Sequence, residues 1–211
     1  MSTLNQLGIK YATDKCFREH PTDPEKNFGH GYLDSYEQFM QPYVGKGITL
    51  IEIGVGGEEF PDRGGQSIRL WEHYFQNAHV IGVDLYKKNM VRNFVQASQD
   101  DPVAMGALPD ADIIIDDASH INPLSIATFK IMWQKVKPGG LYIFEDNHTS
   151  YWQDKYLGDA DPAYDGSAIN FFLNLVHQLQ QDTLLEKYRL DYRFKFFHFI
   201  RNSVIIGKPS S

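Results

Sequence analysis

Two apolar stretches of the sequence each end in a pair of neighbouring carboxylic acids. DIIIDDASH carries Asp116, Asp117 and His120, and the later stretch LYIFEDN carries Glu145 and Asp146. Apolar runs of this kind indicate buried parallel strands, and the carboxyl ends of neighbouring parallel strands meet at one edge of a sheet. Carboxylates crowded together there would raise the pKa of at least one of them. A bound divalent cation relieves this conflict, and oxygen ligands favour Mg²⁺ or another hard cation over zinc.

Two histidines follow these acids at the same interval. His120 lies three residues after Asp117, where a general base with a pKa near neutrality is useful, and His148 lies three residues after Glu145. His148 is open to three interpretations: a second base, a substrate contact or a surface residue. A simpler interpretation of the two acid pairs is also open: one acid of each pair caps a helix and the other faces solvent.

A glycine-rich stretch earlier in the chain predicts a cofactor site. IEIGVGG places Glu52 on a strand and Gly54, Gly56 and Gly57 in the loop that leaves it, and Asp84 ends the next apolar strand. Glycines let the backbone approach a ligand closely, and an acid at the end of the second strand suits the hydroxyls of a ribose. The glycines alone are a weak signal, because many strand-to-helix turns contain them.

The loop departs from the GxGxxG pattern of dinucleotide-binding domains. Glu58 and Glu59 follow its glycines and would repel a pyrophosphate. A cofactor that has a ribose but no phosphate fits better, and S-adenosylmethionine is such a cofactor. A second glycine pair, Gly64 and Gly65, precedes a predicted helix whose free amides would meet the carboxylate of the methionine portion.

The elements around these residues alternate between strands and helices. We expect five parallel strands, two further strands and three main helices; the strands are at 49–55, 79–85, 93–97, 112–118, 141–147, 193–200 and 203–208, and the helices at 67–75, 124–136 and 167–180. KPGG at 137–140 is predicted to be a tight turn. The two-residue link before the last strand permits only an antiparallel hairpin. The predicted fold is therefore α/β, a Rossmann-like seven-stranded sheet with an antiparallel C-terminal hairpin, as in class I S-adenosylmethionine methyltransferases.

The N-terminal segment has a different composition from the rest of the chain. Residues 1–45 are expected to be irregular, with a helix near Leu33–Met40, and 46–211 to form the catalytic domain as one structural unit. The segment is either a poorly ordered tail or a cap over the active site. Its aromatic residues favour the cap: Phe28, Tyr32, Tyr36 and Phe39.

The composition limits which binding partners and which cellular compartment are expected for the protein. The net charge of −7 over 211 residues argues against a dedicated nucleic-acid or anionic-membrane surface. A single cysteine, Cys16, rules out an internal disulfide, and neither a signal peptide nor a long apolar span is apparent. These features predict a soluble protein of the cytoplasm.

Several of these motifs together resemble a known family. TDK at 13–15, IEIGVGG, GGQSIRLW, IIDDASH and EDNHTSYW are similar to the metal-dependent O-methyltransferases of natural-product pathways, nearest to the macrolide-sugar 2-O-methyltransferases of the mycinamicin and tylosin type. The motifs occur in the same order between residue 7 and about residue 152. We expect the sequence to correspond to the catalytic domain of the family alone, without its additional N-terminal domain. It departs from the family pattern by Ala12 in place of a glycine and by Ser98 in place of an acid.

The resemblance implies roles for individual residues. It implies Mg²⁺, or another hard divalent cation, held by Asp117, Glu145 and Asp146, with His120 as the catalytic base. It also implies a pocket for S-adenosylmethionine lined by Glu52, Gly54, Gly56, Gly57, Ser67, Asp84, Gln99 and Asp116. The expected reaction is methyl transfer to a hydroxyl of a small natural product, a sugar moiety or a polyketide. The acceptor is either free or tethered to a carrier protein, and a homo-oligomer is expected.

Two other functions remain open on the sequence. The same acids could serve a metal-dependent hydrolase or a hydroxylase-like enzyme, although a two-histidine iron centre would require His148 beside His120. The chain could also be a non-catalytic scaffold that binds the cofactor. The polar loop at 153–166 is in a position to form a mobile lid. The aromatic residues in and beside it could stack on a sugar or on a flat polyketide, or they could be ordinary packing: Tyr151, Trp152, Tyr156 and Tyr164.

Overall fold

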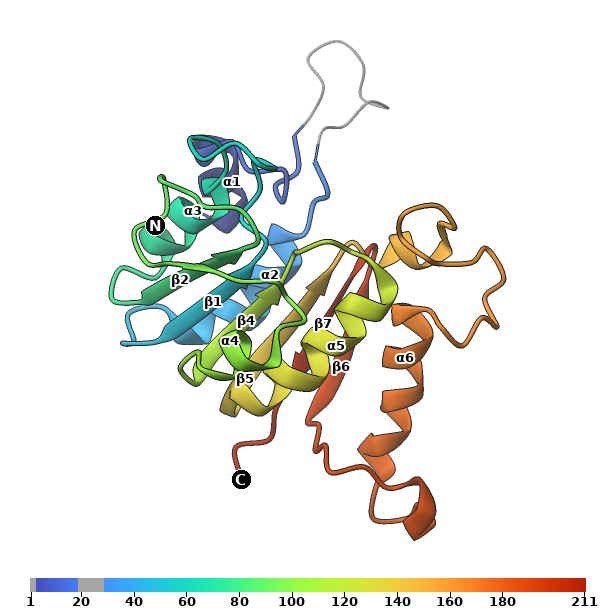
Figure 1. The fold of residues 1–211 in the computed structure, drawn as a ribbon. Helices are drawn as coiled ribbons and strands as arrows, with labels where there is room; N and C mark the ends of the chain where they lie inside the picture. Colours follow the sequence, from blue (N-terminus) through green and yellow to red (C-terminus); the bar gives the residue numbers. More distant parts are fainter. Residues whose placement is uncertain (1–2, 19–28) are drawn as a thin grey trace. The chain divides into compact units, whose positions relative to one another are not determined.

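The computed structural model describes residues 3–18 and 29–211 (Figure 1). The chain divides into two compact units, Met1–Gln96 and Ala97–Ser211. Within the described residues, seven strands follow the order β3-β2-β1-β4-β5-β7-β6. β1 with β2, β2 with β3, and β4 with β5 pair in parallel, whereas β7 is antiparallel to both β5 and β6. The predicted α/β fold, mostly parallel with an antiparallel C-terminal hairpin, is confirmed.

The first unit contains three parallel strands. β1 (Thr49–Ile53) pairs with β2 (His79–Asp84), and β2 pairs with the short β3 (Phe94–Gln96). Both long strands are almost entirely buried, which explains why their sequences are continuous apolar runs rather than alternating ones. The intervening helix α3 (Gln66–Tyr74) buries an apolar face that includes Trp71.

The N-terminal segment is more regular than the sequence predicted. The helix α1 (Leu4–Tyr11) begins with a capping box formed by Thr3 and Gln6, and it packs against α2 and α3. The helix α2 (Leu33–Met40) matches the predicted range and continues into the short helix η1 (Gln41–Tyr43). The expectation of an irregular start to the chain is therefore wrong for α1. Phe28 lies outside the described residues.

The second unit contains the remaining strands and most of the helices. Its first half comprises α4 (Pro102–Gly106), β4 (Ala111–Asp116), α5 (Asn122–Met132), η2 (Trp133–Lys135) and β5 (Val136–Glu145). Its second half comprises η3 (Asn147–Tyr151), α6 (Ala168–Leu175), η4 (Val176–Gln180), η5 (Glu186–Tyr188), β6 (Phe196–Ile200) and β7 (Ser203–Gly207). β7 is fully buried between β5 and β6.

The KPGG segment is not the predicted turn. It lies within β5, and the pairing of β4 with β5 shifts register between Ala111 and Ile113, as at a β-bulge. Gly139 supplies a positive φ of 79° at this irregularity, and Lys137 Nζ lies 2.8 Å from Asp112 Oδ2. Glycines in a strand often mark such a bulge, so KPGG forms an irregular first part of β5 instead of a turn before it.

Aromatic side chains form much of the core of the second unit. Phe129 of α5 is fully buried, and α5 packs against α6 (Figure 1). Ring centroids within 6.5 Å of Phe129 belong to Trp133, Tyr142, Phe171, Phe172, Tyr192 and Phe194. One side chain thus joins the helical layer to strand β5.

None of the described helices is long and apolar enough to span a membrane.

Truncating Phe129 should destabilise the second unit strongly. We expect Phe129→Ala to lower the free energy of unfolding by about 3–5 kcal/mol, because it leaves a cavity among several rings. Val103→Ala, at a position that is 80% exposed, should change it by less than about 0.5 kcal/mol. Urea unfolding followed by circular dichroism measures both, and equal midpoints for the two variants would contradict this account of the core.

Candidate active site

Three of the predicted site residues come together in the second unit. His120 Nε2 lies 3.4 Å from Asp146 Oδ2 and 3.8 Å from Asp117 Oδ1. One ligand atom from each of the three residues lies within 4.8 Å of the other two, and all three side chains are partly buried. Asp117 and His120 lie on the loop after β4, and Asp146 directly follows β5. The parallel pairing of these strands brings the two loops to the same edge.

The backbone turns sharply at two of these positions. His120 and Asp146 have positive φ values of 56° and 53°, which are uncommon for residues other than glycine. The Thr149 hydroxyl lies 3.1 Å from the carbonyl oxygen of His120 and 2.9 Å from that of Asp146. This side chain therefore holds the two turns beside each other. Unusual backbone conformations of this kind concentrate at functional sites.

Two histidines flank the Asp146 carboxylate. His120 approaches Oδ2, and His148 Nδ1 lies 3.9 Å from Oδ1. His120 Nδ1 is buried and has no hydrogen-bond partner among the described residues, so Nε2 is the nitrogen that faces the acids. His148 therefore adjoins the cluster.

Glu145 is the last residue of β5 and is almost fully buried. It pairs in register with Ser203 of β7. Among the described residues, the close group of ligand atoms contains Asp117 and Asp146 but not Glu145. Its predicted role as the third oxygen ligand remains a prediction.

Asp116 has a different environment from its neighbour Asp117. It is buried at the end of β4, where the Tyr142 hydroxyl donates a hydrogen bond of 2.9 Å to Oδ2. Burial raises the pKa of Asp116 to about 7, against the opposing effect of the Tyr142 hydrogen bond. The pKa of Tyr142 is itself raised by burial and by Asp116. Sequence reasoning missed this partnership, because Tyr142 looks like an ordinary strand residue.

Both the nitrogen and the oxygen of the Gln99 side-chain amide form hydrogen bonds within the second unit. Its Nε2 donates to Thr128 Oγ1 at 2.9 Å, and its Oε1 accepts from the Ser119 amide at 3.0 Å. Gln99 thus anchors the loop immediately before His120 to helix α5. Its predicted contact with the cofactor remains a prediction.

The predicted cofactor residues of the first unit lie on a rigid frame. Glu52 is fully buried, with Oε1 3.4 Å from Lys15 Nζ and Oε2 accepting from Trp71 Nε1 at 3.1 Å. Lys15 is also buried and belongs to the TDK motif. This motif is the feature of the sequence that could have identified Lys15 as the partner of Glu52. The ion pair ties the N-terminal segment to β1 and α3.

Asp84 holds the glycine loop against the end of β2. Its Oδ2 accepts from the Val55 amide at 3.1 Å, and its Oδ1 accepts from the Tyr86 amide at 3.0 Å. A carboxylate has about four acceptor sites in total. Two of them therefore remain for the hydroxyls of a ribose, which keeps the predicted role of Asp84 chemically available.

The glycine loop closes on itself by backbone contact. Gly54, Gly56 and Gly57 all have positive φ, and a Cβ on Gly64 would lie 2.2 Å from the Gly56 carbonyl oxygen. The amide of Gly65 donates to Val55 O at 2.7 Å. It is therefore not one of the free amides that the sequence predicted at the start of α3. Ser67, in the first turn of α3, is buried.

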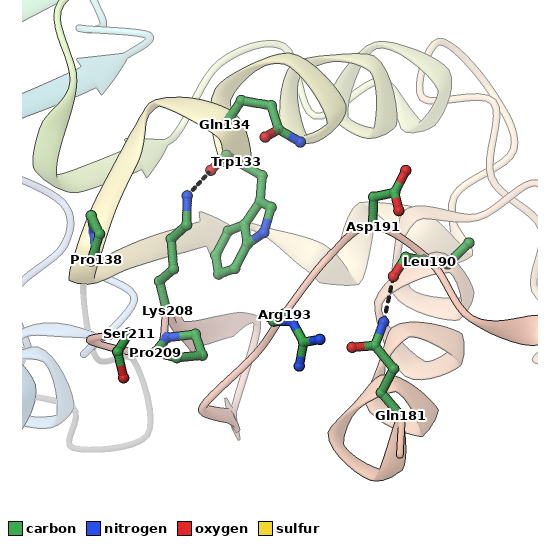
Figure 2. Close-up of a pocket in the computed structure, with 10 residues that line it drawn as sticks. All are labelled: Trp133, Gln134, Pro138, Gln181, Leu190, Asp191, Arg193, Lys208, Pro209 and Ser211. Carbon is green, nitrogen blue, oxygen red and sulfur yellow. Dashed lines mark hydrogen bonds between the residues drawn. The ribbon is translucent and has the colours of Figure 1, made fainter. Parts of the chain in front are cut away.

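A separate hollow of about 390 Å³ lies at the other end of β5 (Figure 2). Lys208 crosses it and donates to the carbonyl oxygens of Trp133 and Val136 at 3.0 and 2.6 Å, and burial lowers its pKa. Pro138 at its rim and Glu145 are seven residues apart along the strand, or roughly 20 Å. The hollow is therefore distinct from the acidic cluster.

The raised pKa of Asp116 predicts a pH-dependent stability. A folded-state pKa of about 7, above the ordinary value of 3.8, gives stability that is present below pH 4 and is lost as the pH rises through 7. In the presence of a chelator, the advantage of wild type over Asp116→Asn should therefore fall between pH 4 and 8, by at most about 4 kcal/mol. Urea unfolding across this range measures it. A pH-independent difference would contradict the burial argument.

No family model matches the chain. It is 42% identical over 131 residues to the 8-demethyl-8-alpha-L-rhamnosyl tetracenomycin-C 2'-O-methyltransferase of Streptomyces olivaceus, covering 58% of this chain and 35% of the relative. It is 32% identical over 190 residues to the mycinamicin VI 2''-O-methyltransferase of Micromonospora griseorubida, covering 86% and 45%. The chain thus spans less than half the length of these relatives.

A solved structure extends the likeness to the whole fold. It is the MycE methyltransferase of the mycinamycin biosynthetic pathway in complex with Mg, SAH and mycinamycin VI, with a TM-score of 0.88 and 28% identity. The match covers 99% of this chain and 54% of that one. The chain therefore has the class I S-adenosylmethionine methyltransferase fold and is related to the O-methyltransferases that act on mycinamicin VI and on rhamnosyl tetracenomycin C.

Proposed function

We propose that the chain is an S-adenosylmethionine- and Mg²⁺-dependent O-methyltransferase that acts on a hydroxyl of a small natural product, a sugar moiety or a polyketide. The observation that carries this proposal is the convergence of Asp117, His120 and Asp146 at the end of β4 and β5. A pair of carboxylates with a base beside them, on a methyltransferase fold, is suited to removing a proton from an alcohol.

The donor set fits a hard divalent cation. Asp117 and Asp146 would supply oxygen ligands, and Glu145, the last residue of β5, would supply a third. A dication bound there stabilises the alkoxide and so lowers the pKa of a coordinated hydroxyl. Magnesium prefers oxygen ligands, which leaves the imidazole of His120 to act as a base.

We propose that His120 takes the proton of the acceptor. Its Nε2 faces the two carboxylates, so a hydroxyl held beside them lies within reach of this nitrogen. The hydroxyl proton moves to Nε2 while the oxygen forms a bond to the methyl carbon. The bond between that carbon and sulfur breaks, and its two electrons remain on sulfur. His120 leaves the step protonated.

The cofactor half of the proposal rests on the first unit. Asp84 would bind the ribose hydroxyls, and the positive-φ glycines at 54, 56 and 57 would allow close approach of the backbone. Glu52, held by Lys15 and Trp71, keeps β1 in place below that loop. We propose the same pocket for Ser67, and the cofactor roles predicted for Gln99 and Asp116 remain predictions. The acceptor, free or carrier-bound, and assembly as a homo-oligomer in the cytoplasm belong to the same proposal.

A hydroxylase-like iron centre is a weaker second candidate. Two histidines do flank Asp146, but His120 and His148 approach different oxygens of its carboxylate. Among the described residues, the compact group of ligand atoms contains Asp117 rather than His148. Binding of S-adenosylmethionine by the purified protein, followed by calorimetry, would favour methyl transfer, whereas retention of iron without cofactor binding would favour the hydroxylase.

Removing the proposed base should separate chemistry from binding. We expect His120→Ala to lower kcat by about 10²–10⁴-fold, because proton removal is lost, while the affinity for S-adenosylmethionine stays near that of wild type. Release of S-adenosylhomocysteine and calorimetric titration measure the two quantities. The exposed control His177→Ala should retain full activity. Near wild-type turnover in His120→Ala would overturn the assignment.

Removing one of the proposed ligands should weaken metal binding. We expect chelation to abolish turnover and Mg²⁺ to restore it, and Asp146→Asn to weaken the binding of Mn²⁺ roughly tenfold or more. Electron paramagnetic resonance of free Mn²⁺ measures the binding. The exposed Asp182→Asn serves as the matched control. Undiminished activity after exhaustive chelation would contradict the metal-dependent mechanism.

A further inference from the structure

Lys88 is a buried cation that the proposed mechanism does not use. It lies four residues after Asp84, on the loop that follows β2, and is only 2% exposed. Lysine is rarely buried to this extent unless its ammonium group is paired. The partners of this group in the structure therefore indicate what the residue does.

The partners of Lys88 are backbone carbonyl groups of the loop between β1 and α3. Its Nζ donates to the carbonyl oxygen of Glu58 and, at 3.4 Å, to that of Phe60. Within residues 3–18 and 29–211 it forms no ion pair with a carboxylate. A hydrogen bond from a charged donor is stronger than one between neutral groups. The ammonium group therefore holds the backbone of this loop and does not neutralise an acid.

The residue after Lys88 holds the same loop at a second place. The Asn89 amide donates to Pro61 O at 2.8 Å, and Asn89 Nδ2 donates to Asp62 Oδ1 at 2.9 Å. We call the segment Glu58–Asp62 the flap. Two consecutive residues after β2 thus fasten the flap by four hydrogen bonds. Asn89 is exposed whereas Lys88 is buried, so water competes least with the bonds of Lys88.

The flap is joined at both ends to the glycine loop. Gly57 precedes it and Arg63 follows it, and a Cβ on Gly57 would lie 2.4 Å from the carbonyl carbon of Arg63. The backbones on the two sides of the flap are therefore in direct contact. Asp84 accepts from the Val55 amide near the start of the glycine loop. The loop after β2 thus fixes the glycine loop twice, through Asp84 near its start and through Lys88 by way of the flap.

We infer that Lys88 is a positioning residue of the cofactor site. Its ammonium group holds the flap against the loop after β2, and so keeps the glycine loop in the conformation that receives S-adenosylmethionine. This inference rests on the proposed function, because it takes the glycine loop as the cofactor site. A loop that is ordered before its ligand arrives lowers the cost of binding. Lys88 has no part in the proton transfer proposed for His120, so its loss should act on cofactor affinity.

Replacing Lys88 by methionine removes the ammonium group and keeps a side chain of similar length. We expect Lys88→Met in the full chain to weaken the binding of S-adenosylmethionine about tenfold or more, because the charged hydrogen bonds to the flap are lost. Lys88→Arg retains a charged donor and should recover most of this affinity. Isothermal titration calorimetry measures the binding of the cofactor by both variants and by wild type.

Hydrogen exchange of the flap reports on the same role without any ligand. The Phe60 amide donates to Gly57 O and the Arg63 amide to Phe60 O, so both are protected while the flap is closed. In ligand-free Lys88→Met, peptides that contain these amides should exchange about tenfold faster, as measured by mass spectrometry. Lys87→Met is the matched control at the adjacent exposed lysine, and both quantities should stay within about twofold of wild type.

The outcomes separate this inference from a purely structural role. Wild-type affinity in Lys88→Met would reject it, and so would faster exchange spread evenly over the first unit, which indicates a general loss of stability. If Lys88→Met does not fold, Asn89→Asp is the second variant, because its carboxylate would repel Asp62 and loosen the flap. It should weaken cofactor binding about threefold and speed flap exchange; unchanged values would reject the inference.

The same titrations distinguish failure of this inference from failure of the proposed function. Wild-type protein that does not bind S-adenosylmethionine would reject the proposed function, and the positioning role with it. Binding by wild type that Lys88→Met leaves unchanged would reject the positioning role alone.

Discussion

The pairing of β4 with β5 is the constraint on which the candidate site depends. Both strands are parallel and almost fully buried, so the chain must leave each of them at the same edge of the sheet. The acids that follow the strands are thereby brought close to one another despite their repulsion. A crowded pair of carboxylates is unfavourable in an empty site and favourable around a dication. The proposed mechanism depends on this repulsion, because it favours binding of the dication that activates the acceptor hydroxyl.

The loops around the cluster are held in place by side-chain hydrogen bonds. Thr149 joins the turns at His120 and Asp146, Gln99 anchors the loop before His120, and Asn122 fastens the loop after Trp152. Each of these three polar side chains is buried and bonded to the backbone of a neighbouring loop. Catalytic groups whose positions are set in advance do not have to be ordered when the substrate binds.

Several features lay beyond prediction from the sequence for identifiable reasons. The helix α1 is only eight residues long, and its capping box of Thr3 and Gln6 was the one local signal for it. KPGG has the composition of a turn, but pairing with β4 and a bulge keep it within β5. The partners of the buried acids, Tyr142 for Asp116 and Lys15 for Glu52, come from distant parts of the chain.

The sequence by itself determined the α/β fold, the order of its strands and helices, and the identity of the acids and histidine at the strand ends. Continuous apolar runs and glycine-rich turns carry that information locally. Only the tertiary structure decided that Asp116 is buried against Tyr142 while the adjacent Asp117 joins His120 and Asp146. The reason is geometric: Asp116 is the last residue of β4, so its surroundings depend on the register of a neighbouring strand that is remote in sequence, whereas Asp117 already belongs to the loop.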